Sequence, residues 1–219
     1  MDSNLGTEID YNIPFCSNTE DDTHCFQAAL KMVMKYFWPD KDYSWEDLEI
    51  ITKKVEGLWT WPMAGLLWLA EQRVEVIDIE VFDYNRFIAK GGKYLIDEYG
   101  KEVGESQIAH SDIEQERKIS EDFLRKLRVT KAIPKIEDIK QLLSGGYVLI
   151  CNINSQALND EDGYTGHSVV LKGFNDNYLF LHDPGLPPQE NRQVSFEVFE
   201  KAWAYPSEKA KNIMAFKLK

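Results

Sequence analysis

Residues 25–37 form a long apolar stretch in which polar side chains recur only at every fourth position. These polar residues are Gln27, Lys31 and Lys35. A spacing of four places them along one narrow stripe of a helix, so the remaining surface must be covered by other elements. Short polar residues suited to an N-cap precede the stretch: Asp21, Asp22 and Thr23. The pattern predicts a buried central helix with Cys25 in its first turn.

Residues 44–82 begin with helical periodicity and end with alternating apolar and charged positions. Ser44 and Asp47 resemble a capping box ahead of apolar residues at helical spacing, which predicts a second helix. Residues 63–72 are apolar almost all round and predict a third helix. Residues 74–82 alternate between apolar and charged side chains, which predicts a strand with a slip at Ile77 and Asp78.

The last third of the chain is typical of a sheet with few helices. Its predicted elements are a helix at 136–143, strands at 147–153, 166–174 and 178–183, a helix at 195–202 and a strand at 212–218, with a polar loop at 155–164 and a turn at 175–177. Helices first and strands later favour an α+β fold. We expect one domain over residues 1–219.

Residues 84–135 differ from both flanks in composition. They are charged and helix-prone, are interrupted by glycines, and carry no strand signal. This predicts an inserted helical lobe. Its helices either pack on the core with a solvated outer face or form a lid or wall over a site.

Charge and cysteine content narrow the class of protein. The formal net charge is -12, which argues against nucleic acid and against an anionic membrane surface as partners. There is no signal-peptide pattern and no run of about 18 apolar residues, so we expect a cytoplasmic protein. Three scattered cysteines indicate neither a disulfide framework nor a zinc site, and no motif calls for a cofactor.

Three residues with catalytic chemistry fall at the ends of predicted elements. Cys25 opens the central helix, His167 lies at the start of one strand, and Asp183 ends the next. A hairpin that turns at 175–177 brings the two outer strand ends together. If that edge of the sheet meets the helix N-terminus, the imidazole can take the thiol proton while the carboxylate orients the imidazole.

The segments around these residues match a known pattern in order, spacing and context. The matching segments are residues 13–15 (IPF), 24–33 (HCFQAALKMV), 166–174 (GHSVVLKGF), 181–184 (LHDP) and 199–203 (FEKAW). The chain thereby resembles the C39-like peptidase domain of the papain-like cysteine peptidases, over roughly the first 80 residues and from Pro134 onward. The resemblance implies a papain-like fold with Cys25 as nucleophile, His167 as general base, Asp183 as the orienting acid and Trp203 in a packing role.

Two positions depart from the pattern of that family. Phe26 follows the cysteine where the family has glycine, and residues 17–19 offer no glutamine for the oxyanion hole. Asn18 is the candidate amide donor beside the backbone N–H of Cys25. The implied reaction is hydrolysis of a peptide, or of another amide or ester, through an acyl-enzyme.

Several alternatives remain open from the residues. The same triad could transfer an acyl group to an amine or thiol, or the fold could serve as a peptide-binding module without catalysis. A metal site is conceivable from four clustered residues: His24, Cys25, His182 and Asp183. A tryptophan cluster belongs either to the core or to an aromatic cleft: Trp59, Trp61 and Trp68. Cys16 and Cys151 are expected to be structural.

Overall fold

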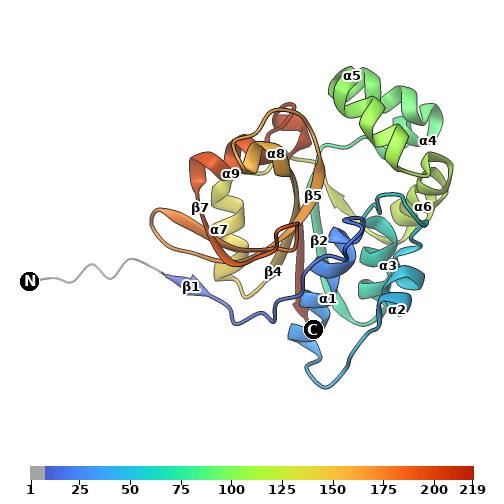
Figure 1. The fold of residues 1–219 in the computed structure, drawn as a ribbon. Coiled ribbons are helices and arrows are strands. Elements are labelled where there is room, and N and C mark those ends of the chain that lie inside the picture. Colours follow the sequence, from blue (N-terminus) through green and yellow to red (C-terminus); the bar gives the residue numbers. More distant parts are fainter. Residues whose placement is uncertain (1–7) are drawn as a thin grey trace, which may run out of the picture.

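A single mixed sheet separates two groups of helices (Figure 1). The structure is a computed structural model that describes residues 8–219. The helices are α1 (Cys25–Phe37), α2 (Trp45–Thr52), α3 (Met63–Glu71), α4 (Tyr84–Lys90), α5 (Gly92–His110), α6 (Ile113–Lys126), α7 (Ile136–Ser144), α8 (Ser155–Leu158) and α9 (Phe196–Trp203). The strands are β1 (Ile9–Asp10), β2 (Val74–Glu80), β3 (Val129–Thr130), β4 (Val148–Asn154), β5 (Gly166–Phe174), β6 (Tyr178–Asp183), β7 (Gln189–Ser195) and β8 (Asn212–Leu218).

The strands follow the order β3-β2-β8-β4-β5-β6-β7, and β1 pairs with the far end of β5. All neighbours are antiparallel except β2 and β3, which are parallel. The register pairs Glu80 with Asn212 and Ile153 with His167. The end of β2, the start of β8, the end of β4 and the start of β5 therefore lie at one edge of the sheet.

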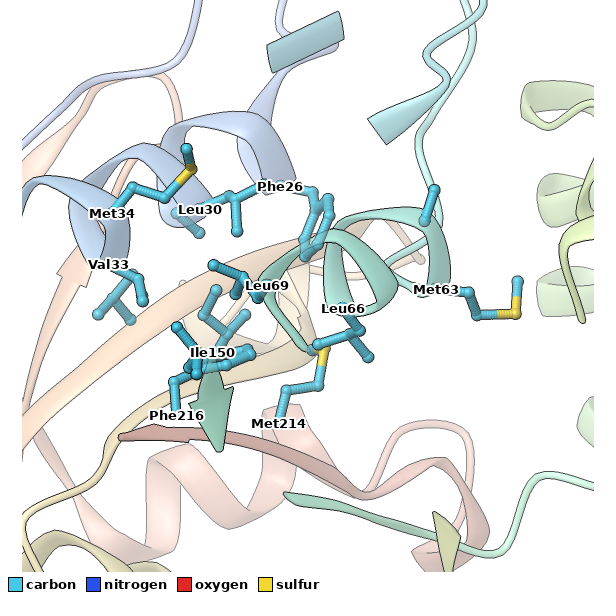
Figure 2. Close-up of a cluster of buried hydrophobic side chains, with 14 of the residues drawn as sticks. Phe26, Leu30, Val33, Met34, Met63, Leu66, Leu69, Ile150, Met214 and Phe216 are labelled. Carbon is cyan, nitrogen blue, oxygen red and sulfur yellow. The ribbon is translucent and has the colours of Figure 1, made fainter. Parts of the chain in front are cut away.

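Each face of the sheet has its own apolar core. On one face, α1 and α3 pack over β2, β8, β4 and β5, and Figure 2 shows their side chains meeting those of the sheet. The labelled residues of this core are Phe26, Leu30, Val33, Met34, Met63, Leu66, Leu69, Ile150, Met214 and Phe216. On the other face, α7, α8 and α9 cover a second core that includes Leu149, Leu171 and Trp203. The α+β, papain-like class is confirmed.

The central helix begins where its sequence predicts, but its cap is different. Its N-cap is His24, which makes no capping bond with its side chain, so the prediction of Asp21, Asp22 or Thr23 as N-cap is wrong. The side chain of Asn18 accepts a hydrogen bond from the His24 N–H at 2.8 Å. The loop before α1 is thus held by an amide from six residues upstream rather than by a local cap.

Phe26 fits into the core because α3 presents a glycine to it. Phe26 is 1% exposed. A Cβ added to Gly65 would lie 2.9 Å from Cε1 of Phe26 and 3.2 Å from Cδ2 of Leu30. The large residue after the cysteine is therefore matched by a missing side chain on the facing helix.

Several local expectations are wrong in instructive ways. β2 pairs with β8 residue by residue, so there is no slip at Ile77 and Asp78. The predicted loop at 155–164 begins with the short helix α8, capped by the Asn154 side chain. β1 and β7 are not predicted from the sequence, because their apolar patterns are weak. Both are strands through their pairing with a neighbouring strand.

Residues 84–135 contain α4, α5 and α6, as their composition predicts, and also β3, which was not expected. β3 ties the end of this segment to β2. α5 is interrupted at Gly100, whose φ is 84°. Its two halves pack closely, since a Cβ on Gly92 would meet Ile108 and one on Gly104 would meet the backbone of Ile96. That this segment is an insertion in one continuous domain stays a prediction.

Candidate active site

The sheet edge described above brings the predicted residues to the N-terminus of α1. His167 Nε2 lies 2.7 Å from Asp183 Oδ1 across the β5–β6 hairpin. Cys25 lines the same cavity as His167 and Ser168. His167 is 7% exposed and Asp183 is 5% exposed. The structure therefore gathers the partly buried thiol, the imidazole and the carboxylate at the N-terminus of α1, and their joint role as a catalytic triad stays a prediction.

The electrostatics of Cys25, His167 and Asp183 favour a thiolate beside an imidazolium. Burial by itself raises the pKa of the Cys25 thiol, but the hydrogen bond and charge of His167 outweigh it and leave that pKa lowered. Asp22 acts weakly in the opposite direction. Burial also lowers the pKa of His167, yet its bonds to Asp183 and Cys25 raise it to about 10. The two protons are coupled, so the pair titrates as a unit.

Arg192 on β7 anchors the carboxylate and was missed at the level of sequence. Its Nη1 donates to Asp183 Oδ2 at 2.8 Å, and its Nη2 donates to the Leu158 carbonyl and to Asn159 Oδ1. The N–H of Gly185 donates to Asp183 Oδ1 at 3.0 Å. The pKa of Asp183 is lowered: burial alone would raise it, and these bonds with that of His167 overcome the effect. A lone arginine in a polar edge strand carries no sequence signal of this role.

The loop before Cys25 is tied to the loop after Asp183. The Asn18 N–H donates to the Pro184 carbonyl at 2.8 Å. The Asn18 side chain accepts from the His24 and Thr19 N–H groups and donates to Asp22 Oδ1 at 2.7 Å. One amide hydrogen of Asn18 is thus engaged within the loop. Its proposed part in an oxyanion hole stays a prediction.

The two histidines that flank the site have other partners. The ring of His24 contacts Thr19 and Glu49, at 2.7 and 2.8 Å. His182 Nε2 lies 2.8 Å from the Ile13 carbonyl. Across residues 8–219 no cluster of three His, Cys, Asp or Glu side chains has the geometry to hold a metal ion. The four residues of the conceivable metal site are instead divided among separate contacts.

A cavity opens beside Cys25 and His167 and runs along the sheet edge toward α5. Its walls come from the sheet edge, from the loop at 59–62, from α5 and from the segment at 203–212. Trp59 and Trp61 line it, whereas Trp68 packs against Trp38 and Tyr43. The tryptophan cluster is thus divided between the cleft and the core.

Polar contacts join α5 to the main body across this cavity. Gln107 donates to the Tyr164 hydroxyl at 2.8 Å, and the Tyr205 hydroxyl donates to Glu102 at 2.7 Å. The ring of Trp59 stacks on His110 with 4.5 Å between centroids. The middle segment therefore supplies a wall of the candidate site, the second of the two roles that its sequence allows.

The remaining cysteines are free thiols away from this site. Cys151 is fully buried within β4, and burial raises its pKa well above that of a free thiol. Cys16 is partly buried and its pKa is also raised, chiefly by burial. Cys25 is thus the one cysteine of residues 8–219 whose pKa is lowered.

Comparisons with known proteins agree with the geometry. The Peptidase_C39 like family matches residues 11–211, a range that runs through the middle segment as well. A search of curated sequences gives no significant match.

None of the helices that the structure describes combines the length and hydropathy that a membrane span requires.

Three solved structures share the fold at low sequence identity. A protein described as a C39-like peptidase from Bacillus anthracis has a TM-score of 0.53 and 14% identity, covering 97% of this chain and 98% of its own. A double glycine motif protease from an AMS/PCAT transporter, solved with its leader peptide, has a TM-score of 0.51 and 13% identity, covering 97% and 99%. The peptidase domain of Streptococcus ComA, a bi-functional ABC transporter in quorum sensing, has a TM-score of 0.50 and 14% identity, covering 95% and 100%.

The thiol at the start of a buried helix, the histidine and aspartate at the facing sheet edge, and a family match over residues 11–211 lead to one assignment. This chain belongs to the Peptidase_C39 like family and has its papain-like fold.

Proposed function

We propose that this protein is a thiol peptidase that cleaves a peptide or related amide through an acyl-enzyme on Cys25. The observation that carries the proposal is that Cys25 and His167 line the same cavity, with the His167 imidazole 2.7 Å from the Asp183 carboxylate. The lowered pKa of Cys25 supports it, because the thiolate is the nucleophile.

Each residue has a defined part in the reaction. The Cys25 sulfur attacks the carbonyl carbon, and the electron pair of the C=O bond moves to its oxygen. His167 gives its proton to the leaving amine as the C–N bond breaks, which leaves a thioester on Cys25. A water molecule then attacks the thioester, His167 takes a proton from that water, and Cys25 leaves as the thiolate. Asp183 holds the imidazole in the required tautomer and balances its charge.

The negative oxygen that forms in this reaction needs hydrogen-bond donors. The backbone N–H of Cys25 lies in the first turn of α1, where N–H groups have no acceptor within the helix, and the helix dipole favours negative charge there. Asn18 is the candidate second donor through the amide hydrogen that Asp22 does not take. Loss of one such donor costs about 10²- to 10³-fold in rate.

The test is the rate at which iodoacetamide alkylates Cys25 at pH 7, with the site identified by peptide mapping. A thiol with an ordinary pKa is only a few per cent thiolate at pH 7, whereas His167 lowers the pKa of Cys25 and so raises its thiolate fraction. His167→Ala should therefore slow alkylation by about tenfold or more, after allowance for the lower intrinsic nucleophilicity of a low-pKa thiolate.

The matched control is His110→Ala, since that histidine ends α5, where its ring contacts the Ser106 carbonyl and stacks on Trp59 but does not line the cavity beside Cys25. It should leave the alkylation rate unchanged. Equal rates for wild type and His167→Ala would contradict the proposed pairing. Incubation of a denatured protein with wild type and with Cys25→Ala then tests catalysis directly, because only the wild type should release new peptide amines.

A further inference from the structure

One acidic residue lines the cavity that Cys25 and His167 also line. Glu80, the last residue of β2, lines the cavity, and its Oε1 accepts a hydrogen bond from the Tyr84 hydroxyl at 2.5 Å. Asp78 lies two residues earlier and therefore on the same face of β2, within hydrogen-bonding reach of Glu80. Burial raises the pKa of both carboxyl groups, that of Glu80 to about 7, and their proximity disfavours a second charge, so the pair carries at most one negative charge at neutral pH.

This charge lacks a cationic partner. Within residues 8–219, neither Asp78 nor Glu80 forms an ion pair with a Lys, Arg or His side chain. Asp78 is only 3% exposed, and its Oδ2 has no hydrogen-bond partner at all. Without a cationic partner these carboxyl groups shift their pKa values upward and tend to be neutral, whereas a cation bound beside Glu80 would favour its ionised form.

Aromatic side chains surround the same carboxylate. Trp61, Phe82, Tyr84 and Tyr99 line this part of the cavity together with Glu80. Phe82 lies at the centre of the group, with ring centroids 4.8 Å from Tyr84, 5.9 Å from Trp61 and 6.3 Å from Tyr99. Aromatic faces around a carboxylate are the usual surroundings of an organic cation, because ring faces attract positive charge and the apolar stem packs between them.

We propose that this acidic aromatic pocket binds a cationic side chain, an ammonium or guanidinium, of the peptide that Cys25 acts on. The assignment rests on the proposed function for the route by which the peptide reaches the pocket. The net charge of -12 favours the approach of such a substrate. Tyr84 and Tyr99 belong to the middle segment at 84–135, and Phe82 lies two residues before it, so this part of the chain would select the substrate while the sheet edge performs the chemistry.

The test measures binding rather than turnover, in the full-length Cys25→Ala protein. The two probes are acetyl-Ala-Ala-Lys-Ala-Ala-amide and the same peptide with norleucine in place of lysine, which removes the ammonium and keeps the stem. Isothermal titration should show that the lysine peptide binds about tenfold or more tightly, since one carboxylate contact and the ring faces supply roughly 1.4 kcal/mol or more.

A matched pair of variants assigns the difference to Glu80. Glu80→Gln keeps the shape and removes the charge, so it should abolish most of the preference for lysine. Glu75→Gln lies on the same strand but on the opposite face and should preserve the preference. Equal binding of the lysine and norleucine peptides would overturn the proposal. A preference for the lysine peptide that persists in Glu80→Gln would overturn it as well.

The outcome is separable from that of the proposed function. If wild type cleaves protein substrates but the two probes bind equally, the peptidase proposal stands and the pocket assignment fails. If the lysine peptide is preferred through Glu80 and no substrate is cleaved, the pocket assignment stands and catalysis fails.

Discussion

Replacement of Arg192 by methionine tests whether the candidate site depends on a charge outside the Cys-His-Asp set. The guanidinium is the partner of Asp183 Oδ2 at 2.8 Å, while Oδ1 is shared by His167 and the Gly185 N–H. Methionine keeps the apolar stem and removes the charge and all three donated hydrogen bonds. The carboxylate would then remain buried with one oxygen unpaired.

The structure sets the size of the effect. A hydrogen bond to a charged group contributes about 1.5–3 kcal/mol, and removal of one partner of a buried ion pair costs roughly 3–5 kcal/mol. The lower range applies here, because His167 still offers a positive charge to Asp183. The bond of Arg192 to Asn159 is exposed and adds little, and its bond to the Leu158 carbonyl joins a charged donor to an uncharged acceptor and can be replaced in part by water. We expect a loss of about 2–3 kcal/mol in the free energy of unfolding at pH 7.

The stability difference between wild type and Arg192→Met should depend on pH in one direction. The pKa of Asp183 is lowered in the folded protein, so its contribution to stability is present above the unfolded carboxyl pKa of about 3.9 and is lost as the pH falls. The difference in unfolding free energy between wild type and Arg192→Met should therefore be full from pH 7 down to about pH 4 and narrow below that pH. The pH at which Cys25 becomes alkylated should also move upward, because a positive charge is removed from its surroundings.

Urea unfolding at several pH values and the pH profile of iodoacetamide labelling measure the two effects. Arg125→Met is the matched control, since that arginine pairs with Asp122 on the exposed face of α6 and should cost less than about 1 kcal/mol. A loss below about 0.5 kcal/mol for Arg192→Met, on the order of an ordinary surface change, together with an unmoved labelling profile would refute the reasoning.

Three further changes test other parts of the structure. Gly173→Ala places a Cβ against the Ile9 carbonyl, and backbone atoms cannot move aside as a side chain can. The free energy of unfolding in urea should therefore fall by about 1–3 kcal/mol. Unchanged stability would argue against the β1–β5 pairing. Gly65→Ala crowds the Phe26 ring and should lower the free energy of unfolding by about 1–2 kcal/mol beyond the gain in helix propensity. The same change in a Phe26→Leu protein should cost much less, and additive effects in this double-mutant cycle would contradict the contact. Burial raises the pKa of Glu80 from 4.5 to about 7, so its protonated form stabilises the fold and that contribution is lost as the pH rises from about 4.5 through 7. Glu80→Gln should therefore be more stable than wild type at pH 8 but not at pH 4. Equal unfolding free energies for the two proteins at every pH would refute the burial of this charge.

The strongly periodic elements follow from the sequence by itself. The central helix from Cys25, the capping box of Ser44 and Asp47, and the β5–β6 hairpin all depend on residues close together in the chain. Local propensity and the burial of one face are enough to specify them. The positions of Cys25, His167 and Asp183 at the ends of these elements could therefore be predicted from the sequence, and their joint role in catalysis stays a proposal.

Other features depend on contacts between distant residues. β7 is polar along its length and is a strand only because β6 offers its edge, and Arg192 reaches Asp183 only through that pairing. The Phe26 ring fits only because Gly65 faces it from another helix. Neither relation leaves a periodic signal in one stretch of sequence.

The acidic aromatic pocket shows the same division most clearly. In the sequence, Glu80 is one charge among 37 acidic residues. The tertiary structure places it under Tyr84 and beside Phe82 and Trp61, in the wall of the cavity that Cys25 also lines. Periodicity reports which face of an element is buried, whereas the meeting of side chains from separate elements is decided by long-range packing, and the candidate site is built from such meetings.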